Sequence, residues 1–250
     1  MIELNNVKQV VGQGTPLERW VLNGINLKIQ EGEFVTVIGT NGAGKSTLLN
    51  GVAGECLPTC GTIQIDGQDV TRLESYQRAK WIARVFQDPL MGSCGDLTVA
   101  ENMALASQRG SFRSLRRALS SQIRSKFKEA LVDLNLGLEE RLDVPMNQLS
   151  GGQRQAISLV MSTLSPMKVL LLDEHTSALD PRTAEHIMNV TAQIIREKKL
   201  TALMVTHSLS QAIRYGSRTI LLHEGRVVRD LSGPERVGLS VKDLLAMYEF

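Results

Sequence analysis

The sequence predicts an α/β fold with a mostly parallel core sheet that is interrupted by a helical insert. Short apolar runs of strand length alternate with helix-compatible runs in both halves of the chain, which is typical of a parallel sheet covered by helices. From about Thr98 to Leu164 the pattern is helical and carries no strand signal. A chain of 250 residues can bury a sizeable core, so these observations favour one α/β unit with a subdomain over two independent domains.

The first half of the chain is expected to hold strands, a glycine-rich loop and a helix. Alternating polar and apolar residues, or short apolar runs, predict the strands, and Gly32 marks a turn before a buried one. The expected strands lie at residues 2–7, 21–29, 34–38, 61–65 and 82–86, and the expected helix at 46–53.

After the insert, strands and helices alternate again. Pro181 suits the first turn of a helix, because that position needs no backbone N–H donor. The tail at residues 240–250 has the pattern of a short amphipathic helix. The other expected strands lie at residues 169–172, 201–205 and 219–222, and the helices at 181–198 and 208–215.

Composition and charge exclude several classes of protein. Lys and Arg number 28 and Asp and Glu 26, so the formal charge of +2 is too small to indicate nucleic acid as a partner. No apolar run approaches the ~20 residues of a membrane span, and the N-terminus lacks a secretory signal, so we expect a cytosolic chain. Cys56, Cys60 and Cys94 make no disulfide framework and no clear metal site, so we expect reduced thiols.

A phosphate loop is the first motif that indicates chemistry. It reads Gly39-Thr40-Asn41-Gly42-Ala43-Gly44-Lys45-Ser46 and fits G-x-x-x-x-G-K-[ST]. Its glycines let successive backbone N–H groups converge on phosphate oxygens, and the following helix adds its N-terminal dipole. We expect Lys45 to reach the β- and γ-phosphates, Ser46 to ligate Mg²⁺, and Thr47 to belong to the same nucleotide site. An ordinary glycine-rich turn is the alternative, and a chance match occurs in about one chain in a hundred.

An acidic pair, Asp173-Glu174, follows the aliphatic strand at residues 169–172. The carboxyl end of a parallel strand is where such sheets bind ligands, and adjacent strand residues point to opposite sides. We therefore expect Asp173 to hold the Mg²⁺ shell, and Glu174 to orient and deprotonate an attacking water. Taken alone, an Asp-Glu pair is more often a solvated turn, so this hypothesis depends on the phosphate loop.

A second anion site is predicted at the signature segment, residues 149–155. Ser150 is a good helix N-cap, and Gly151 and Gly152 leave the backbone open to an anion. A simple capped helix start is the alternative. Because the chain already has a phosphate loop, a second phosphate site needs its own explanation.

With these motifs in this order, the chain resembles the ATP-binding cassette (ABC) ATPases over nearly its whole length. The matching residues are the signature motif Leu149-Ser150-Gly151-Gly152-Gln153, the Q-loop glutamine Gln87, the D-loop Ser177-Ala178-Leu179-Asp180 and the switch histidine His207. Without the resemblance, His207 would be interpreted as a histidine at the end of a strand with no functional role. In that family two cassettes pack head to tail, and the signature helix of one caps the γ-phosphate held by the other. The second anion site would then face a partner chain's ATP.

The resemblance implies a fold, a reaction and cofactors. It implies a P-loop NTPase of ABC type with an N-terminal antiparallel β subdomain, forming one ATPase domain over residues 1–250. The core and β subdomain would take residues 1–86 and 165–250, and the helical subdomain about 88–164. It also implies ATP hydrolysis with ATP and Mg²⁺ as cofactors, with Glu174, His207 and Gln87 as catalytic residues and Ser46, Gln87 and Asp173 around the metal.

Two departures from the family pattern stand out. His175 occupies a position where the family often has proline. The family also stacks adenine on an aromatic residue before the phosphate loop, but the aligned position is Val11, followed by an insertion at residues 12–19. Trp20 is the nearest aromatic residue, and it is either the adenine platform or a packing residue.

The resemblance further implies partners and a location. A single cassette without a membrane span implies a separate integral membrane permease and a place on the cytoplasmic face of the cell membrane. It also implies a second ATPase chain, expected to form a homodimer, with a heterodimer as the alternative. Residues 88–93, with Leu90 and Met91, would contact the permease unless they are core, and the basic run 109–128 would face lipid or solvent. The chain resembles bacterial uptake ATPases for small solutes, including aromatic amino acid importers that use a solute-binding protein. Exporter or lipoprotein-release ATPases and iron–sulfur assembly ATPases are the alternatives.

Overall fold

Two sheets form the frame of the molecule, for which a computed structural model describes residues 1–110 and 119–248. The first sheet is antiparallel and orders β2 (Arg19–Ile29), β1 (Ile2–Val11), β4 (Cys60–Ile65) and β5 (Gln68–Asp69). The second orders β10 (Arg226–Ser232), β9 (Arg218–His223), β3 (Phe34–Gly39), β8 (Thr201–Val205), β7 (Val169–Asp173) and β6 (Ile82–Val85).

The second sheet is parallel except at one edge. Strands β9, β3, β8, β7 and β6 all run in the same direction, and β10 returns antiparallel to β9. This confirms the predicted fold class. The two-residue β5, the single turn of α2 (Ser75–Arg78) and the edge strand β10 were not predicted, because they are short or largely exposed and carry no apolar period.

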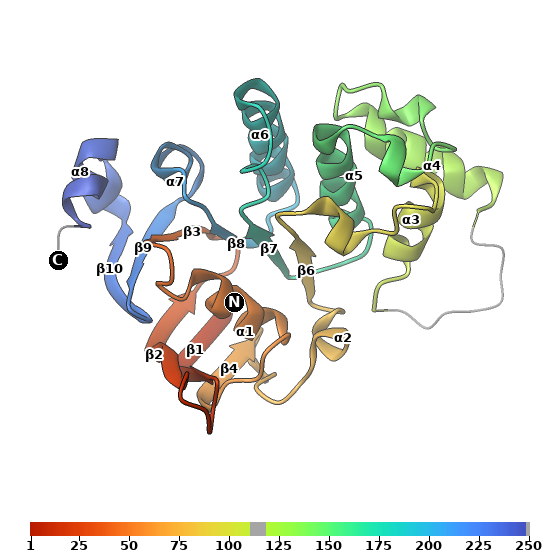
Figure 1. Cartoon of the computed structure of the whole chain (residues 1–250). Helices are drawn as coiled ribbons and strands as arrows, with labels where there is room; N and C mark the ends of the chain where they lie inside the picture. Colours follow the sequence, from red (N-terminus) through yellow and green to blue (C-terminus); the bar gives the residue numbers. More distant parts are fainter. Residues whose placement is uncertain (111–118, 249–250) are drawn as a thin grey trace.

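Helices cover both faces of the parallel sheet, and alternate strand residues decide which side chain meets which helix. Val35 and Val37 pack on the face that carries α1 (Lys45–Ala53) and the antiparallel sheet. Leu170 and Leu172 pack on the opposite face, which carries α5 (Gly151–Thr163) and α6 (Pro181–Glu197). Helix α7 (Leu209–Tyr215) contacts β3, and α8 (Val241–Ala246) packs on α7 (Figure 1).

The helical insert stands beyond β6 at one end of the molecule (Figure 1). Its helices α3 (Val99–Ser107) and α4 (Ser121–Val132) join α5 in one core with strand residues of the sheet. Short 3-10 turns lie at Pro89–Gly92, Leu138–Glu140 and Met146–Gln148, with another at Gly233–Arg236 near the C-terminus. Residues 111–118, and with them much of the predicted basic run, lie outside the described residues, as do 249–250 of the tail.

Cys56, Cys60 and Cys94 carry free thiols. Within residues 1–110 and 119–248, no helix has both the length and the apolarity needed to cross a membrane.

Helix α1 is held at its C-terminal end by a buried arginine. Arg78 is 0% exposed, and its Nη1 donates hydrogen bonds to the carbonyl oxygens of Gly51 at 2.7 Å and Val52 at 2.8 Å. Its Nε donates to the carbonyl of Leu73 at 2.8 Å. Burial lowers the pKa of Arg78 to about 10. The guanidinium thus satisfies helix-end carbonyls that would otherwise lack donors.

We expect Arg78→Met to lower the free energy of unfolding by roughly 3 kcal/mol, because buried carbonyls of α1 lose their donors. Urea unfolding followed by circular dichroism measures this change. Arg72→Met, at an exposed arginine nearby, is the matched control and should shift the free energy by less than about 0.5 kcal/mol. Equal losses for the two variants would contradict the capping role of Arg78.

Candidate functional site

The parallel strands bring the phosphate loop, the acidic pair, Gln87 and His207 to the side of the sheet where the strands have their carboxyl ends. The phosphate loop begins at the last residue of β3, and the acidic pair begins at the last residue of β7. These two strands lie on either side of β8. His207 follows β8, and Gln87 follows β6, the neighbour of β7. Motifs far apart in the sequence therefore meet where the carboxyl ends of the strands lie together.

Close backbone approach demands glycine in the phosphate loop. A Cβ on Gly39 would lie 2.3 Å from the carbonyl oxygen of Leu222. A Cβ on Gly44, whose φ is +100°, would lie 2.7 Å from the carbonyl oxygen of Val21. Both distances are too short for any side chain. The loop is therefore packed between β9 and β2, and α1 begins immediately after it at Lys45.

Lys45 turns its side chain back onto the loop. It is 5% exposed, and its Nζ donates to the carbonyl oxygens of Gly39 at 2.9 Å and Thr40 at 3.0 Å. Burial lowers the pKa of Lys45, and the nearby carboxylate of Glu174 opposes this shift. Ser46 follows at an exposed position of the first helical turn. The ammonium group is thus placed beside the loop whose N–H groups would receive an anion.

The two acidic residues contact different partners. Asp173 ends β7, and its Oδ2 contacts Nη2 of Arg84. Glu174 has left the strand with φ +45°, and its Oε1 lies 2.7 Å from Nε2 of His207. The Glu174 side chain is 12% exposed and that of His207 is 47% exposed, so the pair has an inner carboxylate and an outer imidazole. The two carboxylates therefore have different partners, and the turn of the backbone at Glu174, not alternation along β7, separates them.

The Q-loop and the D-loop contact each other. Gln87 Nε2 donates to Ser177 Oγ at 3.3 Å, and Gln155 of α5 donates from Nε2 to the carbonyl of Phe86 at 3.2 Å. Asp180 caps α6 by accepting a hydrogen bond from the N–H of Thr183 at 3.1 Å. Hydrogen bonding to Thr183 holds the pKa of Asp180 below its ordinary value. Gln87 therefore lies between the insert and the residues that follow the acidic pair.

The signature segment forms a capped and exposed helix start. Ser150 Oγ accepts from the N–H of Gln153 at 3.3 Å, and the N–H of Ser150 donates to Oε1 of Gln153 at 3.1 Å. A Cβ on Gly152 would lie 2.5 Å from Cγ2 of Thr183, so this helix start packs on the start of α6. The side chain of Leu149 is 4% exposed and packs in the core, and its place among the residues that meet the partner's ATP stays a prediction.

Two residues near these motifs were not predicted. Arg84 contacts Asp173, and the signal that could have identified it is a charge inside the apolar strand 82–86. Gln211 of α7 donates from Nε2 to Thr176 Oγ1 at 3.2 Å and accepts from Thr206 Oγ1 at 3.3 Å. It ties together the loops that carry Glu174 and His207, and no local sequence pattern indicates this.

The departures from the family pattern have structural counterparts. His175 is 2% exposed, and burial lowers its pKa to about 4, so the imidazole is neutral. Thr191 Oγ1 donates to the carbonyl of Ile187, so His175 donates from Nε2 to Thr191 across 3.2 Å. Trp20 lies on β2 beside Val10 and is 50% exposed, which leaves its role as an adenine platform a prediction.

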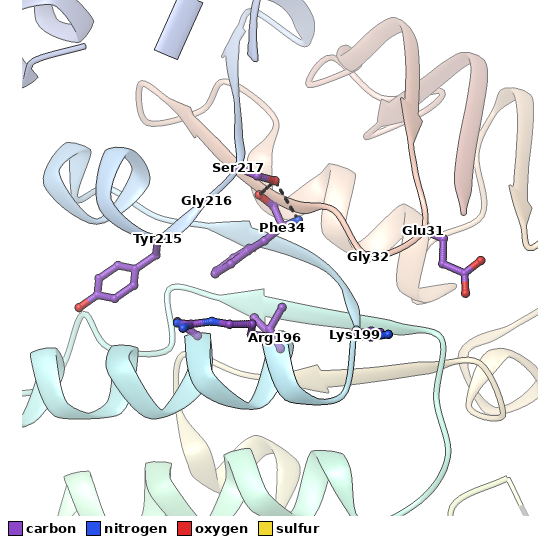
Figure 2. A pocket seen from close by; sticks show the side chains of 10 residues that line it. Glu31, Gly32, Phe34, Arg196, Lys199, Tyr215, Gly216 and Ser217 are labelled. Carbon is purple, nitrogen blue, oxygen red and sulfur yellow. Dashed lines mark hydrogen bonds between the residues drawn. The ribbon is translucent and has the colours of Figure 1, made fainter. Parts of the chain in front are cut away.

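Two of the hollows lie at opposite ends of the parallel strands. One of about 370 Å³ is lined by Glu174, Ser177, His207 and Gln211, at the edge where the motifs meet. The other, of about 750 Å³, is lined by Phe34, Tyr215, Arg196 and Lys199 at the opposite end of β3 (Figure 2). The predicted residues Glu174, Ser177 and His207 thus line the smaller hollow and not the larger one.

Comparison with known proteins identifies the family. Residues 22–177 match the family model described as ABC transporter. The chain belongs to the ABC transporter family. It is 41% identical to a tyrosine transport ATP-binding protein of Clostridioides difficile (strain R20291), over 100% of this chain and 99% of that protein. It is 35% identical to a thiamine import ATP-binding protein of Salmonella choleraesuis (strain SC-B67), over 80% of each chain.

Solved ABC cassettes have the same fold. A dimeric post-hydrolysis state of the ATP-binding cassette MJ0796, bound to ADP and Pi, matches with a TM-score of 0.81 and 32% identity. The match covers 93% of this chain and 98% of that one. The chain is therefore an ABC-type ATPase subunit that binds and hydrolyses ATP.

We expect Lys45→Ala to weaken ATP binding by roughly ten- to a hundredfold, because a charge-assisted contact to phosphate contributes about 1.5–3 kcal/mol. Titration with a fluorescent ATP analogue measures the affinity of this ABC ATPase. Lys28→Ala, at an exposed lysine of β2, is the control and should bind normally. Unchanged affinity in the Lys45 variant would rule out its role in the phosphate loop.

Proposed function

We propose that this ABC ATPase drives solute uptake through a membrane permease, as a pair of chains that closes around two ATP molecules. One observation carries the proposal. Lys45, Gln87, Asp173 and the Glu174–His207 pair converge at one edge of the sheet, while the capped start of α5 is exposed and packs on α6. A phosphate site and a separate anion-binding helix start on one chain fit an active site shared between two chains.

The roles of the residues follow from this geometry. Backbone N–H groups of residues 39–47 and the Lys45 ammonium hold the phosphates. Glu174 accepts the proton of the attacking water, and His207, 2.7 Å from its Oε1, keeps that carboxylate oriented. Gln87, which contacts Ser177, reports the state of the site to the insert. The signature residues Ser150, Gly151, Gly152 and Gln153 receive the γ-phosphate held by the partner chain.

The donor set at the site fits Mg²⁺. Ser46, Gln87 and Asp173 offer hydroxyl, amide and carboxylate oxygens, the hard donors that this cation takes. In the described parts of the chain, no group of three or more His, Cys, Asp or Glu residues is placed to hold a metal. Mg²⁺ ordinarily takes only one or two protein carboxylates together with nucleotide phosphates. The bound cation would neutralise charge that develops on the transferred phosphoryl group.

A separate permease is the proposed membrane partner. Leu90 and Met91 in the 3-10 turn after Gln87 are 40% and 71% exposed, which argues against the alternative that they are core. Beside them lies a hollow of about 250 Å³ lined by Phe86, Pro89, Gly92 and Arg109, among others. An apolar surface next to a hollow, between the sheet and the insert, suits a docking helix. The chain would then lie peripherally on the cytoplasmic face of the membrane.

Uptake is the proposed direction of transport. The relatives above are named for tyrosine transport and for thiamine import, which favours uptake over export, lipoprotein release or iron–sulfur assembly. Because the first of these relatives is named for tyrosine transport, an aromatic amino acid is the first solute to test. A solute-binding protein would deliver it to the permease. Residues 1–86 and 165–250 would form the ATPase core with its β subdomain, and about 88–164 the helical subdomain.

We expect Glu174→Gln to bind ATP, to lose ~10²–10⁴-fold in hydrolysis because the general base is removed, and to accumulate as a dimer. Phosphate release and size-exclusion chromatography with ATP measure the two effects. Glu185→Gln, at an exposed glutamate of α6, should hydrolyse normally. A monomeric Glu174→Gln variant with normal turnover would contradict both the base and the shared site.

The same Glu174→Gln background also tests the signature segment. Adding Ser150→Arg should abolish the ATP-dependent dimer, because the larger charged side chain blocks the helix start. Adding Ser120→Arg should leave the dimer intact, since Ser120 caps α4 by a similar hydrogen bond to Ile123 but lies outside the signature segment. Dimerisation of the Ser150 variant would show that this helix does not meet the partner's nucleotide.

We expect Leu90→Asp with Met91→Asp to abolish co-purification of the permease from detergent-solubilised membranes, because two charges are introduced into an apolar contact. ATP binding by the isolated chain should not change. Val237→Asp, at a residue 85% exposed near the C-terminus, is the control and should leave co-purification intact. Normal co-purification of the double variant would rule out this docking surface.

A further inference from the structure

Arg84 places a positive charge inside the molecule, on one of the two packed faces of the edge strand β6. In β6, Ala83 and Val85 pack with the core around α5, whereas Ile82 packs with the core around α1. Alternation places Arg84 on the same face as Ile82, towards α1. Arg84 is in register with Leu171 of β7, two residues before Asp173. The two charged side chains therefore lie on the same face of neighbouring strands.

The guanidinium of Arg84 is held on several sides. Its Nη2 contacts Oδ2 of Asp173. Its Nη1 lies 2.8 Å from Oδ1 of Asn50, in α1, and 2.7 Å from Oε2 of Glu55, just beyond that helix. Its Cζ lies 4.7 Å from the ring centroid of Phe86. The Arg84 side chain is 10% exposed. Through its contacts with Asp173 and Asn50, it bridges the end of β7 and helix α1, which follows the phosphate loop.

Stability alone is a weak reason for this buried ion pair. Desolvation of two charges offsets most of their attraction, and apolar residues of similar size often serve a core equally well. The Asp173 side chain is 14% exposed and that of Glu174 is 12% exposed, so two adjacent carboxylates lie in a poorly solvated region. Arg84 touches one of these carboxylates, the one proposed to hold the metal shell. The pair is therefore placed to control the charge that a cation meets at Asp173.

We propose that Arg84 is a positioning residue that acts as an internal counter-ion for Asp173, so that the divalent cation enters the site only together with ATP. This inference rests on the proposed role of Asp173 in the Mg²⁺ shell. Before nucleotide binds, the guanidinium is shared between Asp173 and Glu55 and offsets part of the negative charge that a dication would meet at Asp173. The phosphates of ATP add the further negative charge that attracts the dication. Contact at Oδ2 also orients the carboxylate and leaves its other oxygen for the metal shell.

The affinity of the nucleotide-free protein for Mn²⁺, measured by electron paramagnetic resonance, tests the proposal, since Mn²⁺ accepts the same oxygen ligands as Mg²⁺. We expect Arg84→Met to bind Mn²⁺ at least about tenfold more tightly than the wild type, because a unit charge beside the carboxylate is lost. Structural damage would not produce such a gain. Arg84→Lys keeps the charge, so its affinity should stay within about threefold of the wild type.

Matched variants show where the gain arises. Arg218→Met is one control, because Arg218 also pairs with carboxylates, Asp230 at 2.6 Å and Glu33 at 3.2 Å, but at the start of β9 and away from the motifs. It should not change Mn²⁺ affinity. Adding Asp173→Asn to Arg84→Met should remove the gain. A gain that survives this second change, or no gain in Arg84→Met, overturns the proposal.

Binding of Mn²⁺ in the presence of ATP separates this inference from the proposed function. Asp173→Asn alone should weaken that binding. If it does, and Arg84→Met still shows no gain without nucleotide, the role of Arg84 fails while that of Asp173 stands. If Asp173→Asn leaves Mn²⁺ binding with ATP unchanged, the metal role of Asp173 fails and the role of Arg84 fails with it.

Discussion

The parallel pairing of β3, β8, β7 and β6 is the constraint on which the rest of the structure depends. It places Val37 beside Val205, Asp173 beside Val205, and Val85 beside Leu172, so neighbouring strands end at the same level. The phosphate loop, the acidic pair, Gln87 and His207 leave the sheet from that level, whereas the signature segment begins α5 outside the sheet. A shift of register by one residue would reverse the side chains of a strand and turn Asp173 to the opposite face.

Helix α1 connects this edge to the rest of the molecule. Its first turn follows the phosphate loop, and its last turn is capped by the buried Arg78. Between them, Asn50 contacts Arg84, which also contacts Asp173. The phosphate loop and the carboxylate of Asp173, which we propose holds the metal shell, are therefore joined through one helix and one guanidinium.

Adjacent residues in the site have different contacts. Asp173 and Glu174 are adjacent in sequence, but one contacts Arg84 and the other contacts His207. In the signature segment, Leu149 is buried in the core while Ser150 caps an exposed helix start. In both cases, adjacent residues contact different parts of the molecule, which allows the different roles that we propose for them.

Local patterns in the sequence predicted much of the fold and the candidate site. The phosphate loop, the acidic pair and the capped start at Ser150 need particular residues at short spacings, since backbone conformation and helix capping are local properties. Edge strand β10 and the short α2 were missed, because they bury little apolar surface and show no period. The insert was predicted as helical, and α3, α4 and α5 confirm it over the described residues.

By itself, the sequence determined the class of fold, the kind of ATPase and the motifs that a nucleotide would meet. Only the tertiary structure decided which side chains outside those motifs join them. Arg84 meets Asp173 across a separation of 89 residues, and Gln211 meets Thr176 across 35. Such contacts depend on strand register and helix packing, which arise from the whole core and leave no signal in a local stretch of sequence.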